Sequence, residues 1–161
     1  PKLLAYPFGE YTGDLAAIAR ELGFTAFGQQ SGALGTRSDP RALPRFPMAE
    51  AFGEREEFAV KAASLPLPVV AAEPWDPVVR HNPPRLEVTL APLGGNTERL
   101  ACYAEGRRME VEWLEPGRRF AVRADKPLSP PRGRYNCTAP AAGGRYYWYS
   151  HLWITPQAEP R

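Results

Sequence analysis

The chain has 161 residues, close to the size of a single domain, and 43% of them are hydrophobic, which argues against a fully disordered chain. Its 19 prolines are too frequent for a bundle of long helices, and no stretch approaches the roughly 18 apolar residues of a transmembrane helix. The net charge is only +2, and acidic residues separate the arginine pairs, which argues against nucleic-acid binding.

The first 65 residues alternate between strand and helix patterns. Residues 3–6 are apolar and predict a strand, and residues 24–27 predict a second strand. Thr12 can cap a helix over residues 13–22, and a second helix is expected over 54–64. One face of the first helix is apolar and consists of Leu15, Ile18, Ala19 and Leu22. This order of elements is typical of an α/β fold.

The pattern changes after residue 65. Six prolines lie within residues 66–84, so this segment predicts an extended connector. Alternation of apolar and polar residues dominates residues 85–161, where about six short strands are expected. The sequence therefore predicts three parts: an α/β part over 1–65, the connector, and a small β-sandwich domain over 85–161.

The two cysteines, Cys102 and Cys137, both lie in strand-like segments, and only one intrachain pairing is possible. A disulfide between them would link two strands and imply an oxidising compartment. The alternative is two buried free thiols that act as small apolar residues. The two histidines, His81 and His151, are too far apart in sequence to complete a zinc site with these cysteines.

The strand expected near the C-terminus is rich in aromatic residues on both faces. One face carries Tyr146, Trp148, Ser150 and Leu152, and the other carries Tyr147, Tyr149, His151 and Trp153. One face could be an exposed platform that stacks on sugar rings. In the alternative, which we favour, one face fills the sandwich core and the other packs against the first part of the chain. His151 is then a strand residue with a hydrogen-bond partner rather than a catalytic base.

Residues 4–11 read Leu-Ala-Tyr-Pro-Phe-Gly-Glu-Tyr, and the predicted helix, Gly23–Phe27 and Leu43–Met48 follow them. Over about residues 3–68 this order resembles the C-terminal third of the catalytic domain in polysaccharide deacetylases of the NodB-homology family. The resemblance implies a (β/α) barrel in which a divalent, zinc-like metal activates water to remove acetyl groups from an amino-sugar polymer. The expected fold is α/β followed by all-β: a partial (β/α) barrel of deacetylase type with a small C-terminal β-sandwich.

The resemblance also implies roles for individual residues. It places the Pro-Phe-Gly element beside the metal and gives the backbone N–H of Phe8 the role of stabilising the oxyanion. The substrate-binding candidates are Tyr6, Pro7, Gly9, Glu10, Tyr11, Gln29 and Arg45. Each has a structural alternative: packing for the aromatic side chains, a solvated cap for Glu10, a polar loop for Gln29 and an ion-pair partner for Arg45.

The metal ligands of the family are missing from this sequence. In the family they are an Asp-Asp pair and two histidines about one helical turn apart, upstream of the Pro-Phe-Gly element. This chain has no Asp-Asp pair and no histidine before His81. We therefore expect the chain alone to bind no metal and to be inactive, and the strand that begins at residue 3 suggests a piece of a longer protein.

The leading hypothesis is the C-terminal segment of a bacterial polysaccharide deacetylase that is periplasmic or secreted. Its expected partners are an amino-sugar polymer and the missing N-terminal part of the same protein, with no nucleic acid. The alternative is a non-catalytic glycan-binding or structural assembly module, and a third possibility is a stable remnant without activity of its own.

Overall fold

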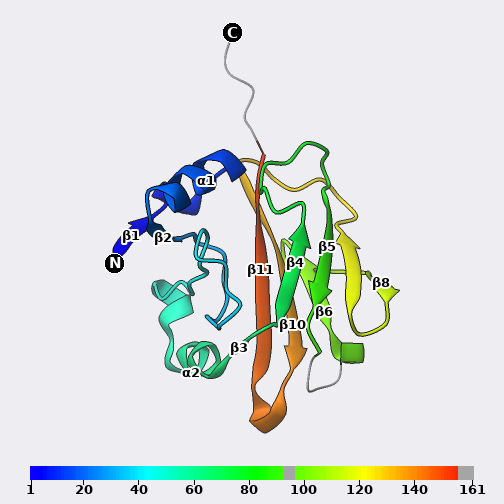
Figure 1. The fold of residues 1–161 in the computed structure, drawn as a ribbon. Coiled ribbons are helices and arrows are strands. Elements are labelled where there is room, and N and C mark those ends of the chain that lie inside the picture. Colours follow the sequence, from blue (N-terminus) through cyan, green and yellow to red (C-terminus); the bar gives the residue numbers. More distant parts are fainter. Residues whose placement is uncertain (93–96, 156–161) are drawn as a thin grey trace.

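The computed structural model describes residues 1–92 and 97–155, and these residues form mainly β-structure (Figure 1). The expected partial (β/α) barrel is wrong: the described residues contain three sheets and two α-helices, and no sheet closes into a barrel. The expected disulfide between Cys102 and Cys137 and the expected β-structure of the second half are present. Residues 156–161, which we included in the predicted β-sandwich domain, lie outside the described residues.

The N-terminal part contains a two-stranded parallel sheet. Strand β1 (Lys2–Ala5) pairs with β2 (Phe24–Phe27), and helix α1 (Gly13–Glu21) connects them. Thr12 caps the helix as predicted, because its Oγ1 accepts a hydrogen bond from the Leu15 N–H at 3.2 Å. Helix α2 (Arg55–Ala63) follows a long loop. In a barrel both edges of β1 would be paired, but in the described part of the chain β1 pairs only with β2.

Three of the four residues in the predicted apolar face of α1 point to solvent. Leu15, Ile18 and Leu22 are exposed, whereas the two buried residues of the helix are the small Ala16 and Ala19. Close contact through alanines holds α1 against the rest of the chain and leaves the larger side chains uncovered. The helical spacing predicted the apolar face but not its exposure.

Two larger sheets pack face to face. The five-stranded sheet runs in the order β3 (Leu65–Pro66), β11 (Tyr146–Ile154), β10 (Arg132–Pro140), β6 (Ala101–Ala104) and β7 (Arg107–Met109). The four-stranded sheet runs β4 (Val69–Glu73), β5 (Arg85–Leu90), β9 (Arg119–Arg123) and β8 (Val111–Glu115). Strands β3 and β4 therefore begin within or beside the predicted connector, which contributes one strand to each sheet.

The core between these sheets follows from the alternation seen in the sequence. In β5, Leu86, Val88 and Leu90 point inward, while the residues between them are half-buried. Phe120 of β9 and Trp153 of β11 are fully buried in the same cluster. Each such large apolar side chain contributes roughly 1.5–3 kcal/mol of burial free energy, so this cluster is the main source of stability in the described fold.

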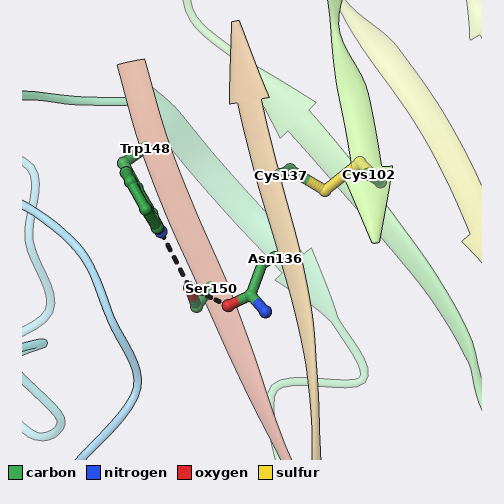
Figure 2. The surroundings of a disulfide bond; sticks show 5 residues. All are labelled: Cys102, Asn136, Cys137, Trp148 and Ser150. Atoms are coloured by element: carbon green, nitrogen blue, oxygen red, sulfur yellow. Dashed lines mark hydrogen bonds between the residues drawn. A yellow bond between two sulfur atoms is a disulfide. The ribbon is translucent and has the colours of Figure 1, made fainter. Parts of the chain in front are cut away.

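The disulfide joins two neighbouring strands of the five-stranded sheet. Cys102 of β6 and Cys137 of β10 are directly opposite each other in the antiparallel register, and both are buried (Figure 2). A covalent bond at this point fixes the register of β6 against β10 and adds to the hydrophobic core.

A second, smaller cluster joins the N-terminal part to the outer face of β11. It contains Tyr6, Tyr11, Ala16, Ala26, Ala42 and Leu152, with Leu4, Trp75 and Ile154 packed against it. The opposite face of β11 points into the sandwich core, where Tyr147, Tyr149 and Trp153 pack. Strand β11 thus uses one aromatic face for each part of the chain, as favoured above, and the N-terminal part lies to one side of it (left in Figure 1).

Candidate functional site

The Pro-Phe-Gly element forms a tight turn directly after β1. Phe8 adopts φ 55°, a left-handed conformation that is unfavourable for a bulky residue, and its side chain is 71% exposed. Gly9 follows with φ 72°, and a Cβ at this position would lie 2.5 Å from the Cβ of Gln29, so only glycine fits. A strained turn that projects an aromatic ring into solvent has no packing explanation, and such strain is often found at functional sites.

Arg132 of β10 holds this turn against the five-stranded sheet. Its Nη1 donates a hydrogen bond to the Phe8 carbonyl at 3.1 Å, and its Nε lies 3.0 Å from Oε1 of Glu10. The guanidinium carbon is 5.7 Å from the centre of the Phe8 ring. Arg132 therefore fixes the backbone of Phe8, the carboxylate of Glu10 and one side of the ring at once.

The segment after β2 completes the surface. Gln29 is exposed beside Gly9, and its carbonyl accepts a hydrogen bond from Nη1 of Arg134 at 3.2 Å. We name Phe8, Glu10, Gln29 and Arg132 the Phe8 surface. It combines one exposed aromatic ring with a carboxylate, a guanidinium and an amide. Arg132 and Arg134 of β10 hold the two segments in place through their bonds to Phe8, Glu10 and Gln29.

The other predicted site residues take different places. Tyr6 and Tyr11 are buried with their rings 5.0 Å apart, and the hydroxyl of Tyr6 donates to the Arg41 carbonyl at 2.9 Å. Burial raises the pKa of both phenols, which stay protonated. Pro7 is exposed next to Phe8, and the Nε of Arg45 donates to the Gly28 carbonyl at 2.9 Å. The structure therefore brings Phe8, Glu10 and Gln29 together and places the two tyrosines beneath them as packing.

An ion pair stabilises the aromatic cluster under this surface. Burial of the Asp39 carboxyl would raise its pKa, but hydrogen bonds from Arg41 outweigh that effect and lower it. The Arg41 guanidinium also lies 4.1 Å from the centre of the Trp75 ring, and Trp75 contacts Tyr11. These contacts fix the loop over 39–42 against the second apolar cluster.

A cleft of about 300 Å³ lies between the loop over 30–39, strand β4 and strand β11, and its lining residues include none of the Phe8 surface. Aromatic side chains, including Trp75 and Trp148, line it together with short polar side chains such as Ser31. Trp148 is held in place by Phe46, whose ring meets it edge-on at 5.1 Å, and by its Nε1, which donates to Ser150 at 3.3 Å (Figure 2).

His151 also lines the cleft, but it does not have the properties of a catalytic base. Burial lowers its pKa to about 3, so the ring is neutral at ordinary pH. Its Nδ1 lies 3.1 Å from the Tyr149 hydroxyl, while its Nε2 has no hydrogen-bond partner in the described structure. The ring packs 4.5 Å from that of Trp153, which is a core contact.

The described residues do not fit a metal ion. Among residues 1–92 and 97–155, no three His, Cys, Asp or Glu side chains are grouped so that they could hold one. No reaction step that requires a metal is therefore assigned to the described part of this chain. No helix in that part is long and apolar enough to cross a membrane.

Comparison with known proteins gives no relative: no family model and no curated protein matches the chain.

Sequence reasoning missed Arg132 and Arg134. Their positions two residues apart on a strand indicate one shared face, but nothing in the sequence shows that this face meets the Pro-Phe-Gly turn, which lies about 120 residues earlier in the chain. The contact exists only because β10 and the N-terminal part pack together.

Proposed function

We propose that this chain is the polymer-binding C-terminal segment of a polysaccharide deacetylase, and that its Phe8 surface binds an amino-sugar polymer. The observation that carries this proposal is the exposed ring of Phe8, held in a strained turn beside Arg132 and Glu10. The family resemblance of residues 4–11 supports the same assignment, because those residues include the turn itself.

The chemistry of the surface suits a sugar. A pyranose ring has an apolar face that can stack on an aromatic ring, and its hydroxyl and acetamido groups can bond to charged and amide side chains at the edge. In the proposed complex Phe8 supplies the stacking face, while Glu10, Gln29 and Arg132 supply the polar contacts. The backbone N–H of Phe8 would stabilise the oxyanion in the intact enzyme.

Removal of acetyl groups would require the divalent metal of the family, and its ligands would come from a part of the protein outside this chain. Two features support such a partner. Leu15, Ile18 and Leu22 form an exposed apolar surface on α1, and the outer edge of β1 is unpaired in the described structure. A two-stranded parallel sheet rarely stands alone, so we propose that the upstream part of the same protein covers this surface.

The disulfide supports a periplasmic or secreted location in a bacterium. Disulfides persist in oxidising compartments and are rare in the reducing cytosol. The buried position of Cys102 and Cys137 in two paired strands fits a permanent structural bond rather than a redox site.

Replacing Phe8 tests the proposal. We expect Phe8→Ala to weaken binding of chitohexaose, an N-acetylglucosamine oligosaccharide, about three- to tenfold, since the stacking partner is lost. Isothermal titration calorimetry measures this change. The matched control is Phe58→Ala, which removes another exposed phenyl ring, from α2, and should leave the affinity unchanged. Equal affinity of Phe8→Ala and the unsubstituted chain, or no binding by either, would contradict the proposal.

The second candidate is a non-catalytic assembly module, which the exposed apolar face of α1 favours. The two candidates differ in the whole protein. Release of acetate from the polymer by the full-length protein supports the deacetylase, whereas polymer binding without acetate release supports the assembly module.

A further inference from the structure

The outer face of the five-stranded sheet continues away from the Phe8 surface across β10, β6 and β7. Asn136 of β10, Tyr103 of β6 and Arg108 of β7 are register partners on adjacent strands and form one row across the sheet. Adjacent strands lie about 4.8 Å apart, so the row spans roughly 10 Å. Arg134 precedes Asn136 by two residues on the same face and connects the row to Gln29.

This face carries positive charge that the chain itself does not neutralise. Arg132 has Glu10 as its partner, but neither Arg108 nor Arg134 makes an ion pair in the described part of the chain. The outer face of the four-stranded sheet is the opposite case. There Arg85 pairs with Glu87 and Glu112, and Arg119 also pairs with Glu87. The arginines on the outer face of the four-stranded sheet are thus paired with glutamates. The face with unpaired arginines is the one that adjoins the Phe8 surface.

The polar groups of this face are mostly hydrogen-bond donors. The Asn136 Oδ1 accepts from the Ser150 hydroxyl at 2.6 Å, and Ser150 accepts from the Trp148 Nε1 (Figure 2). These two bonds occupy the acceptor of Asn136 and leave its amide N–H groups to donate. The guanidinium groups of Arg108 and Arg134 add further donors, and Tyr103 adds a hydroxyl. A ligand that fits this set must supply acceptors, preferably charged ones.

We propose that this face binds the acidic groups of the polymer, so that the ligand is a polymer in which acetamido sugars alternate with carboxylate-bearing sugars. The inference rests on the proposed function, because the acetamido sugar would occupy the Phe8 surface. Carboxylates on the next sugars then meet Arg134 and Arg108, where a planar guanidinium can bond both carboxylate oxygens. A neutral polymer would use only the Phe8 surface.

The test compares two oligosaccharides that share N-acetylglucosamine but differ in charge. A hyaluronan octasaccharide alternates N-acetylglucosamine with glucuronate, and chitohexaose is neutral. We expect the chain to bind the octasaccharide at least tenfold more tightly at low salt, with a preference that falls as salt is added. In Arg108→Ala/Arg134→Ala this preference should fall below about threefold, whereas Arg108→Lys/Arg134→Lys should keep part of it.

The matched control is Arg20→Ala/Arg55→Ala, which removes the same charge from exposed positions on α1 and α2 and should keep the preference. Equal affinity of the unsubstituted chain for the two oligosaccharides overturns the inference. The inference also fails if the control variant loses as much of the preference as Arg108→Ala/Arg134→Ala does. Tighter binding of a single-stranded DNA of matched charge would assign the face to nucleic acid instead. If neither sugar binds, the proposed function fails as well; if chitohexaose binds through Phe8 without any acidic preference, only this inference fails.

Discussion

At the scale of single residues, the site depends on a conformation that Phe8 would not adopt by itself. The left-handed backbone of a non-glycine residue costs on the order of 1 kcal/mol, and an exposed phenyl ring recovers little by packing. Arg132 compensates through its bond to the Phe8 carbonyl and its ion pair with Glu10. A second glycine at this position would adopt the same backbone without that cost, but it would remove the ring.

His151 gives a prediction about pH. Its pKa is about 3 in the fold against about 6.5 in the unfolded chain, so above pH 6.5 the ring is neutral in both states. Below pH 6.5 the unfolded state takes up a proton that the folded state does not, and stability falls as the pH decreases. Between pH 7 and pH 5 the unsubstituted chain should lose about 2 kcal/mol more than His151→Gln, measured by urea unfolding.

The control for this prediction is the other histidine. His81 is exposed, and His81→Gln makes the same substitution away from the core, so it serves as the matched variant. The prediction is wrong if the unsubstituted chain and His151→Gln lose the same unfolding free energy between pH 7 and pH 5. The His151 ring would then take up a proton in the folded state.

At the scale of the elements, strand β11 connects the two parts of the chain. Its inward face completes the sandwich core, and its outward face, with Leu152 and Ile154, contacts the apolar cluster of the N-terminal part. Strand β10 beside it carries Cys137 on the inner face and the arginines of the site on the outer face. The hairpin of β10 and β11 is therefore both the frame of the core and the support of the site.

The disulfide should contribute strongly to the stability of this hairpin and its neighbours. Closing a loop of about 36 residues gives an entropic stabilisation of about 3–4 kcal/mol. Cys102→Ala/Cys137→Ala should therefore lower Tm by about 10 °C in a thermal unfolding scan. The unsubstituted chain in a strong reductant is the matched comparison. A change of less than about 2 °C in both would mean that the core alone holds β6 against β10.

At the scale of the whole molecule, the sequence predicted local structure well and its assembly poorly. The capped helix after Thr12, the alternation in β5 and the pairing of Cys102 with Cys137 follow from local patterns, and all three are present. The barrel was wrong because it came from a resemblance over about 65 residues, and a pattern of strand and helix does not determine how many strands a sheet contains.

The site was predictable in part for the same reason. Phe8, Glu10 and Gln29 follow two parallel strands at the same end, so their proximity could be expected from a parallel sheet. The burial of Tyr6 and Tyr11 and the contact of Arg132 with the turn depend on how the sandwich packs against the N-terminal part, and no local pattern reports this. Strand β4 was missed because prolines surround it, which an edge strand tolerates.

The most direct test of the central claim is to locate bound sugar on the isotope-labelled chain by two-dimensional NMR. We predict that a titrated N-acetylglucosamine oligosaccharide shifts the backbone amide signals of Phe8, Gly9 and Gln29 and the side-chain Nε signal of Arg132, while signals from α2 stay in place. Shifts confined to the cleft around Trp75 and Trp148, or the absence of any shift, would contradict the assignment of the Phe8 surface as the polymer-binding site.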